Sequence, residues 1–500
     1  MKYNRSKGDP HMRKPLNIVW FCTDQQRSDT LSCMGNTAIH TPHIDKLARE
    51  GVLFRRAYCQ SPICTPSRAS FLTGRYPCVT RMFFNGNDRF CQDEVLISKF
   101  LADNGYTCGL TGKLHLTAAK GRMEARGDDG YSFMKWSHHP YNDWPRGINA
   151  YQDWLADNGY DFEKEYAPDN PDAVSHADLK SAAGIREGIR PELHQTTWCV
   201  SEGIEFIRNQ PKDKPWMLSI NVFDPHPPLD PPREYLDRLK NEDMPLPLWK
   251  DGEMDNKPPH QQYDAVHGGQ GGNAEPFPGM SDELKRERVR QYYAQIELID
   301  DQVGRLVDYL DENGLRENTI VIFGSDHGEM NGDHGLYWKG AYFYEALVHV
   351  PLIISCPGTI LQGVERNALM ELVDITPTLL DLCGFEVPYY MQGKSFAPLL
   401  TDPNAEDHCR DSVYSEFYQC LWRAHRDINA TMYFDGRYKI VCYHGHDYGE
   451  LYDLETDPHE FDNLWGKPEY AQLQAELIKK NFDDAINKTR DFSMHRITPY

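Results

Sequence analysis

The sequence predicts an α/β protein whose mostly parallel sheet is covered by helices on both faces. Short apolar runs of strand length alternate along the chain with longer segments that have helical spacing. Strands that are apolar at every position are buried on both faces, as happens in parallel sheets joined by crossover helices. From about residue 385 the pattern changes, so we expect a second, smaller unit in the C-terminal part.

The first strand is predicted at Asn17–Cys22, where the run NIVWFC combines β-branched and aromatic residues. Helical spacing begins at Thr41 and ends at Gly51, a residue type that commonly terminates helices. The alternation then continues along the chain. Further strands are predicted at Tyr106–Leu110, Trp216–Phe223, Thr319–Phe323 and Val350–Ser355, and further helices at Val95–Asn104 and Asp282–Asn313.

Two regions depart from this alternation. Residues 236–280 are rich in proline and glycine, and we interpret them as a long surface insertion that could act as a lid. Near the C-terminus, Arg437–His444 and Tyr448–Leu454 predict a small antiparallel sheet, and Tyr470–Asn487 predicts a closing helix. The expected domains are therefore an α/β domain at 15–384 and a C-terminal subdomain at 385–500. Residues 1–14 are left out because part of them reads like a cloning remnant before a native Met12.

The composition excludes some classes of partner. The formal net charge of −22 argues against nucleic acid or an anionic membrane as the main partner. No apolar run reaches the length of about 18 residues that a membrane-spanning helix needs. The N-terminus shows no secretory signal, so we expect a cytoplasmic protein, or a periplasmic or secreted one if a signal was removed before cloning.

The 13 cysteines are an odd number in a long chain, and they include no Cys-x-x-Cys pair of the metal-binding type. Several of them, such as Cys22, Cys356 and Cys383, lie in apolar stretches. This usage is typical of reduced, buried thiols rather than of a disulfide framework.

Potential metal ligands stand at the carboxyl ends of two predicted strands. Asp24 and Gln25 follow the first strand, and Asp326 and His327 follow the strand at 319–323. Functional groups of parallel sheets gather at such strand ends. Four oxygen or imidazole donors would suit a divalent metal ion. The alternative is that these are ordinary polar residues at the start of loops.

The pentapeptide that begins at Cys64 is a further candidate for a functional motif. Cys64–Arg68, with the sequence CTPSR, resembles the signature at which a maturation enzyme converts cysteine to formylglycine in type I sulfatases of the alkaline phosphatase superfamily. The resemblance extends over roughly residues 15–470 and implies an alkaline-phosphatase-like fold and hydrolysis of sulfate esters. It is also carried by Thr41–Asp45, Gly112–His115, Pro225–Pro228, Ser325–Glu329, Gly332–Gly335, Glu450–Leu454 and Asp457–Glu460. The alternative for Cys64 is an inert core thiol.

The implied chemistry suits a residue at the start of a helix. An aldehyde hydrated to a geminal diol offers one hydroxyl that can attack sulfur and a second whose deprotonation can release sulfate. A serine would lack the second hydroxyl. Pro66 and Ser67 lie at a predicted helix start, where negative charge is favoured.

The resemblance implies that basic residues bind the sulfate and assist its transfer. Arg68 could hold the modified side chain, while Lys113 and His115 are two residues apart and can face the same side. The alternative interpretation is that Arg68 is a solvated surface residue, that Lys113 is exposed and that His115 packs against its neighbours. The implied catalytic residues are Cys64, Arg68, Lys113, His115, Lys339 as a sulfate ligand, and His226 as a proton donor to the leaving oxygen or as another sulfate ligand. Asp333 and His334 are weaker candidates for the site, and the alternative is that either residue only supports its loop.

The implied metal site is Asp24, Gln25, Cys64, Asp326 and His327. Many sulfatases have two aspartates where Asp24 and Gln25 stand, and Asp-Asn where Asp326 and His327 stand; the residues found here resemble some bacterial sulfatases and phosphonate monoester hydrolases. One divalent ion is expected, with calcium first by family habit. The imidazole shifts the preference toward manganese, so manganese and magnesium are alternatives.

Three functions remain open at this point. The first is a sulfatase acting on a small anionic sulfate ester or sulfated oligosaccharide, with a uronic-acid-containing fragment as our first expectation and choline or aryl sulfates as alternatives. The second is a phosphonate monoester or phosphodiester hydrolase. Ser67, the fourth residue of the motif, argues against this function, because serine at that position is the form found in sulfatases. The third is an inactive binding paralogue, disfavoured because the nucleophile and metal residues are present. The maturation enzyme is an implied partner, and the oligomeric state is not predicted.

Aromatic residues are concentrated around Trp136–Trp144 and Trp338–Tyr344. Aromatic rings can stack on sugar rings, which would suit a carbohydrate substrate. The alternative is that these side chains pack in the core and in loops.

Overall fold

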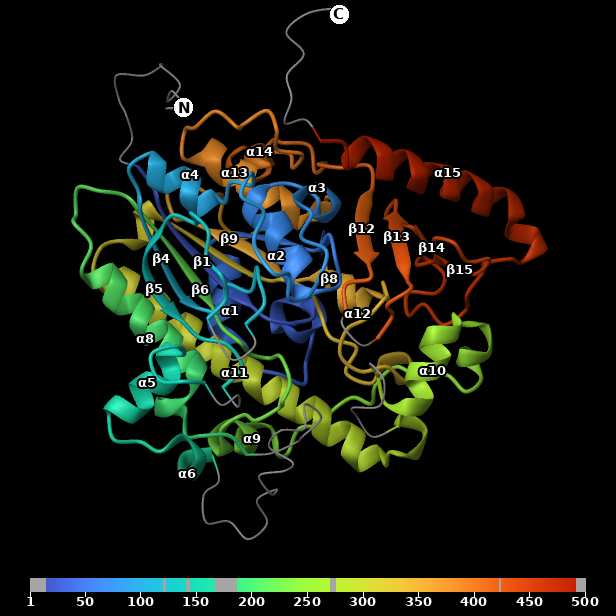
Figure 1. The fold of residues 1–500 in the computed structure, drawn as a ribbon, viewed down its shortest axis with the longest axis horizontal. Coiled ribbons are helices and arrows are strands. Elements are labelled where there is room, and N and C mark those ends of the chain that lie inside the picture. The colour runs from blue at the N-terminus through green and yellow to red at the C-terminus, as the bar shows by residue number, and fades with distance from the viewer. Residues whose placement is uncertain are drawn as a thin grey trace, which may run out of the picture.

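A large mixed sheet forms the centre of the protein in the computed structural model, which describes residues 15–119, 123–140, 144–166, 187–269, 276–421 and 424–491 (Figure 1). Helices cover both faces of this sheet, and a smaller antiparallel sheet lies beside it. In spatial order the strands of the large sheet are β10 (Val364–Arg366), β2 (Val52–Phe54), β9 (Leu352–Ser355), β7 (Thr319–Ser325), β1 (Asn17–Thr23), β6 (Trp216–Asn221), β4 (Thr107–Gly112) and β5 (Tyr131–Trp136). The predicted fold class is confirmed.

The strands of this sheet are mostly parallel. β1 pairs in parallel with β7 on one side and with β6 on the other, and β6, β4 and β5 continue the parallel set. β9 runs antiparallel to both of its neighbours, β7 and β2. One strand was predicted at Val350–Ser355, but the structure has two strands there, β8 (His349–Val350) and β9. Pro351 separates them because it lacks the N–H that strand pairing needs. β8 joins a small sheet with β3 (Ala57–Tyr58) and β11 (Met370–Glu371).

Alternate residues of β1 enter two different cores, which is why its sequence is apolar throughout. Ile18 and Trp20 belong to the cluster that contains side chains of α2 (Cys64–Thr73), α4 (Ile97–Asp103) and α13 (Ile375–Leu382). Val19 and Phe21 belong to the cluster on the other face, with side chains of α1 (Pro42–Arg49), α8 (Gln195–Arg208) and α11 (Asp282–Glu312). The sheet is therefore buried on both sides, and its functional groups can reach solvent only at its strand ends.

The helices that were predicted from the sequence are present in the structure at nearly the same positions. Ser281 caps the N-terminus of the longest, α11, because its hydroxyl accepts a hydrogen bond from Leu284 N at 3.2 Å. The helices are α1 (Pro42–Arg49), α2 (Cys64–Thr73), α3 (Pro77–Thr80), α4 (Ile97–Asp103), α5 (Ala150–Asp157), α6 (Phe162–Tyr166), α8 (Gln195–Arg208), α9 (Arg233–Leu239), α10 (Pro259–His267), α11 (Asp282–Glu312), α12 (Glu345–Val348), α13 (Ile375–Leu382), α14 (Ala397–Thr401) and α15 (Ala471–Lys488). None of the helices in the described ranges combines the length and the apolar character that crossing a bilayer requires.

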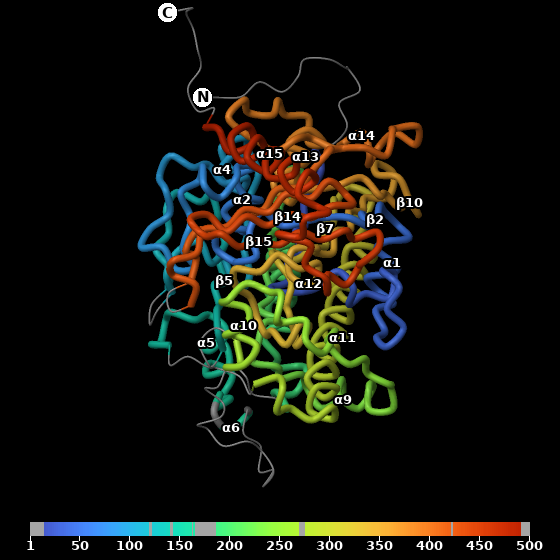
Figure 2. Tube along the Cα trace, turned by 90° about the vertical axis from the view of Figure 1, so that its right-hand side faces the viewer, coloured from blue at the N-terminus to red at the C-terminus, as the bar shows by residue number. Residues whose placement is uncertain are grey.

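The C-terminal sheet is an antiparallel meander. It contains β12 (Val413–Tyr418), β13 (Asn429–Phe434), β14 (Tyr438–Tyr443) and β15 (Gly449–Asp453). α15 lies against β13 and β14. Figure 2 shows this red helix above the strands β14 and β15. The predicted C-terminal sheet and closing helix are confirmed. The domain limits at 384 and 385 stay a prediction.

The segment predicted as a surface insertion is structured where it is described. It contains the end of α9, a 3-10 turn at Glu253–Asn256 and α10. Side chains such as Lys257 and Asp264 are buried, and Asp264 accepts hydrogen bonds from Tyr342 and His425. This part of the segment is therefore packed against the loop that follows β7. The centre of its glycine-rich run lies outside the described residues, and a role as a lid stays a prediction.

Candidate active site

The carboxyl ends of β1 and β7 meet at one edge of the sheet, as the sequence predicted. Their parallel register places Thr23 opposite Ser325, so the residues that follow both strands lie side by side. The backbone N–H of Gln25 donates to Asp326 Oδ1 at 3.0 Å, which holds the two strand ends together. Asp24 and Asp326 are fully buried at this junction.

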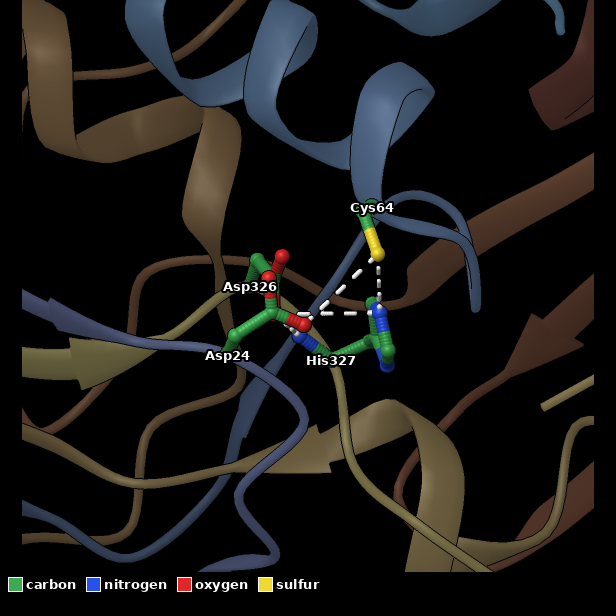
Figure 3. Close-up of side chains that lie close together, drawn as sticks. All are labelled: Asp24, Cys64, Asp326 and His327. Carbon is green, nitrogen blue, oxygen red and sulfur yellow. Dashed lines mark hydrogen bonds and ion pairs between the residues drawn. The ribbon is translucent and has the colours of Figure 1, made fainter. Parts of the chain in front are cut away.

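Cys64 is the first residue of α2, and it points at these strand ends. Its sulfur lies 3.1 Å from His327 Nε2 and 3.7 Å from Asp24 Oδ1 (Figure 3). Ser67, one turn further along, donates from its hydroxyl to the carbonyl of Asp326 at 2.6 Å and fixes the helix to β7. Ligand atoms of Asp24, Cys64, Asp326 and His327 all lie within 4.8 Å of one another. Four of the five predicted metal-site residues therefore converge.

Arg68 joins the two carboxylates of this cluster. Its Nε donates to Asp326 Oδ2 at 2.8 Å, and its second guanidinium nitrogen donates to Asp24 Oδ2 at 3.1 Å. The third guanidinium nitrogen donates to the carbonyl of Lys113 at 3.1 Å. The side chain is 1% exposed, so it is not the solvated arginine of the alternative interpretation. It holds the carboxylates, whereas the resemblance implied contact with residue 64 itself.

Two lysines approach Cys64. Lys339 Nζ donates to Cys64 Sγ at 2.9 Å and to Gln25 Oε1 at 2.6 Å. Lys113 Nζ donates to Asp24 Oδ2 and lies 3.9 Å from Cys64 Sγ. Both lysines are buried, so their charges act in a medium that screens them weakly. Gln25 is thus directed at Lys339, although the prediction placed it among the metal ligands.

The charges around Cys64 change its acidity. Burial and the Asp24 carboxylate raise the pKa of the thiol, but Lys113, Lys339 and His327 more than offset them and lower it below its ordinary value. Burial also opposes ionisation of Asp24, yet Lys113 and Arg68 hold the pKa of Asp24 well below its usual range. The centre is therefore built to stabilise negative charge at position 64 while Asp24 stays ionised.

His327 presents one defined nitrogen to the cluster. Its Nδ1 lies 2.8 Å from the carbonyl of Gly328, which can only accept, so Nδ1 carries a proton. The Nε2 atom is then the nitrogen that faces Cys64 and is available to a metal ion. A backbone carbonyl that fixes the tautomer in this way is a common partner of metal-binding histidines.

His115 and His226 both lie near this centre. Burial and Lys113 lower the pKa of His115, and its Nδ1 has no hydrogen-bond partner within the described parts of the chain. Burial and Lys339 lower the pKa of His226, whose Nδ1 lies 2.6 Å from the carbonyl of Pro227. Both histidines therefore favour the neutral form. A negative charge beside them would favour the protonated form.

The weaker candidates Asp333 and His334 support their loop. Asp333 pairs with Arg27 at 2.7 Å and accepts from the backbone of Leu248. His334 Nδ1 lies 2.6 Å from Glu253 Oε2. The contacts with Leu248 and Glu253 attach the loop after β7 to the segment at 236–280, and the contact with Arg27 attaches it to the segment after β1. None of these contacts involves Asp24, Cys64, Asp326 or His327.

The aromatic residues that suggested sugar stacking are mostly packed inside. Trp136, Tyr342 and Tyr344 are buried, and the Trp136 indole donates to Glu124 Oε1 at 2.7 Å. A buried ring has no free face for a ligand, so the packing alternative is correct for these three residues. Residues 141–143 lie outside the described ranges.

Sequence reasoning missed two buried glutamates that shape the site. Glu329 accepts hydrogen bonds from the Gln25 side chain and from the backbone of Asn331 at 2.8 Å. Glu124 accepts from the backbone N–H groups of His115 and Leu116, both at 2.7 Å. Nothing in the local sequence signals this role, because Glu124 stands in a charged stretch that reads as ordinary surface.

Comparison with known proteins identifies this arrangement. Residues 16–385 match the family model described as Sulfatase, and residues 332–488 match that of N-sulphoglucosamine sulphohydrolase, C-terminal. The chain belongs to the sulfatase family. It is therefore a hydrolase of sulfate esters, as the motif around Cys64 had indicated.

Two relatives match this sulfatase over most of its length. An arylsulfatase of Clostridium perfringens is 32% identical over 477 residues, which cover 93% of this chain and 94% of the relative. An N-acetylglucosamine-6-O-sulfatase of Bacteroides thetaiotaomicron is 26% identical, with 93% of this chain and 85% of the relative covered. The structure of a phosphonate monoester hydrolase from Silicibacter pomeroyi superposes with a TM-score of 0.81 at 25% identity and covers 97% of this chain and 98% of that one. The alkaline-phosphatase-like fold is thereby confirmed.

We expect Glu124→Ala to lower the free energy of unfolding of this sulfatase by about 2–5 kcal/mol, because it leaves several buried N–H groups without an acceptor. Besides His115 and Leu116, the N–H of Thr117 and the Trp136 indole lose their partner. Denaturant unfolding followed by fluorescence measures the change, with the exposed Asp447→Ala as a control. A change below about 0.5 kcal/mol would show that the loop does not depend on this carboxylate.

Proposed function

We propose that this sulfatase hydrolyses a sulfate ester of a carbohydrate, with formylglycine derived from Cys64 as its nucleophile and one divalent metal ion beside it. The observation that carries the proposal is the position of Cys64, which heads α2 and faces Lys339, His327 and Asp24 at once. An inert core thiol would lie among apolar side chains. The relative named as an N-acetylglucosamine-6-O-sulfatase supports a carbohydrate substrate.

The donor set around Cys64 fits a divalent metal ion. Two carboxylates, one imidazole and the side chain at position 64 converge within 4.8 Å, all of them buried. Asp24 Oδ1 is not engaged by Arg68 or Lys113, which both contact Oδ2. Asp24, Asp326 and His327 would therefore hold the ion, and Gln25 would join them only by turning its amide oxygen from Lys339. We place calcium first, because it is the usual ion of the sulfatases that the sequence resembles. Manganese and magnesium are the alternatives for a set of oxygen donors with one imidazole.

When bound, the ion supplies Lewis-acid stabilisation of developing negative charge, and formylglycine supplies an oxygen nucleophile that a thiol does not. The residues of the chain position the ester around them. Lys113 and Lys339 attract sulfate oxygens in a buried setting, and His115 Nδ1, to which no described residue is hydrogen-bonded, can bind a further oxygen. Arg68 keeps the two aspartates in place and compensates their charge, so the lysines are not fully neutralised by them.

His226 is the group proposed to protonate the leaving oxygen. It is held in a loop with three prolines and packs against the rings of Phe223 and His139, with ring centroids 4.7 and 5.2 Å away. In the absence of substrate its pKa is lowered, chiefly by burial. A bound sulfate ester adds negative charge nearby and raises that pKa, so proton donation is linked to substrate binding.

A phosphonate monoester or phosphodiester is the second candidate substrate. The structural similarity to the Silicibacter pomeroyi hydrolase favours it, since the same donors would accept a tetrahedral phosphorus centre. A hydrolysis screen that compares sulfated oligosaccharides, aryl sulfates, choline sulfate and phosphonate esters decides between the two. Higher kcat/KM for the phosphonate esters would replace the sulfate proposal.

Cys64 is expected to mature to formylglycine when the chain is produced together with a maturation enzyme. Mass spectrometry of the tryptic peptide should show loss of the thiol sulfur and gain of an aldehyde oxygen, and sulfatase activity should rise in proportion to the converted fraction. The same chain produced without the maturation enzyme is the control. Full activity from protein that contains only unmodified Cys64 would refute the proposed nucleophile.

Asp326→Ala should remove the metal ion and the activity together, because it deletes a charged ligand and one partner of Arg68. We expect about one divalent ion per chain in the wild type by elemental analysis and far less in the variant. Asp447→Ala, which changes an exposed aspartate, should keep both. Retention of the full metal content in Asp326→Ala would show that the ligand assignment is wrong.

His226→Ala should slow hydrolysis of a sugar sulfate by roughly 10²–10⁴-fold, and hydrolysis of 4-nitrophenyl sulfate far less, because nitrophenol leaves almost without protonation. Both rates are measured on one matured preparation, so that the formylglycine content cancels. Equal losses on the two substrates would instead assign His226 to sulfate binding, since the sulfate is common to both.

A further inference from the structure

A cavity of about 770 Å³ lies between two chain segments that the catalytic proposal does not use. Its walls come from the segment at 81–91, which follows α3, and from Gln419–Leu421 and Arg426, which follow β12. Met82, Asn87 and Cys420 form buried parts of this wall, while Phe84 is 49% exposed. A volume of this size is in the range of sites that enclose small organic ligands.

Both walls of the cavity are attached directly to the active centre. On one side Asn85 Oδ1 lies 3.2 Å from Thr65 Oγ1, and the Thr65 hydroxyl donates to the carbonyl of His115 at 3.0 Å. Thr65 is the residue after Cys64 and is itself buried. This wall is therefore linked by a hydrogen bond to the helix start that carries the proposed nucleophile.

The second wall is attached to the loop that carries Lys339. The backbone N–H of Ala341 donates to His425 Nδ1 at 3.1 Å, and the neighbouring Arg426 lines the cavity. The backbone of Asn85 donates to the carbonyl of Cys420 at 2.8 Å and joins the two walls. The cavity is therefore flanked by the segments that carry Cys64 and Lys339.

The lining of the cavity is positively charged, although the chain as a whole is acidic. Arg81, Arg89 and Arg426 line it together with one aspartate, Asp88, which leaves a net charge of +2 from three positive groups and one negative group. The formal charge of the whole chain is −22. Arg81 pairs with an aspartate, whereas Arg89 is exposed and makes no hydrogen bond or ion pair with any residue the structure describes.

We propose that this cavity binds the alcohol part of the substrate, and that this part is a sugar carrying a second anionic group, either a carboxylate or a further sulfate. The inference rests on the proposed function and names the class of substrate. Phe84 offers an exposed ring for packing against the sugar. Arg89 offers a planar set of donors that matches carboxylate and sulfate oxygens.

The test compares matched ligands and matched variants. The ligands are a glucosamine 6-sulfate disaccharide whose second sugar is a hexuronate, its neutral methyl ester, and a disaccharide with an added O-sulfate on an otherwise neutral second sugar. Arg89→Ala removes a cation that pairs with no described residue, and Arg208→Ala removes an arginine that is also exposed, on α8, which does not line the cavity. Both side chains are exposed, so both variants should fold.

The wild-type enzyme should show higher kcat/KM for at least one of the two doubly anionic disaccharides than for the methyl ester. Arg89→Ala should reduce kcat/KM for the preferred anionic ligand by roughly 5- to 30-fold and change that for the methyl ester less than about twofold. The ligand that loses more identifies the second group as carboxylate or sulfate. Equal losses on charged and neutral ligands, no loss at all, or the same loss in Arg208→Ala would overturn the proposal.

Two further measurements separate this inference from the proposed function. Hydrolysis of 4-nitrophenyl sulfate tests sulfatase chemistry with a ligand that lacks a second anion, and Arg89→Ala should leave it unchanged. Calorimetric binding of the three disaccharides to Cys64→Ala, with and without Arg89→Ala, reports recognition without turnover. If no sulfate is hydrolysed but the anionic disaccharides still bind through Arg89, the proposed chemistry fails and the cavity assignment stands. If hydrolysis proceeds without an Arg89-dependent preference, the cavity assignment alone fails.

Discussion

The buried guanidinium of Arg68 is the interaction on which the active centre depends. It belongs to α2, it contacts the carboxylates that follow β1 and β7, and it reaches the backbone at the end of β4 through the carbonyl of Lys113. Four elements from distant parts of the sequence are thereby fixed relative to one another. Two carboxylates this close together and out of water would be strongly unfavourable without such a compensating charge.

The remaining charges follow from that arrangement. Lys113 and Lys339 reach Cys64 from segments that follow β4 and β7, so positive charge surrounds the position where an anion would be bound and transferred. His115 and His226 are kept neutral by the same burial and the same lysines. An acidic protein can thus recognise a small anion, because the field inside a buried site is set by its nearest groups and the distant surface charge is screened.

The sequence predicted the parts of this structure that are encoded locally. The apolar run before Asp24 and the run before Asp326 placed both aspartates at strand ends, and the pentapeptide around Cys64 placed this cysteine at a helix start. The roles of Glu124 and Glu329 were not predictable in this way, because each depends on backbone groups that only the folded chain brings together. The same holds for Arg89, which the sequence shows as one charge among many. The antiparallel direction of β9 also lacks a local signal, since pairing direction is decided by the connections and not by the strand.

The burial of α2 has a consequence for the timing of biosynthesis. Every residue of this helix is buried, and Cys64 is 0% exposed. An enzyme that modifies Cys64 has to reach its side chain, which is not possible once this helix is enclosed. The conversion proposed for Cys64 would then have to occur while the segment is still unfolded, in competition with folding itself. A chain that folds too quickly would trap its own thiol, so the yield of working enzyme would depend on the order of two events and not on the stability of the finished protein.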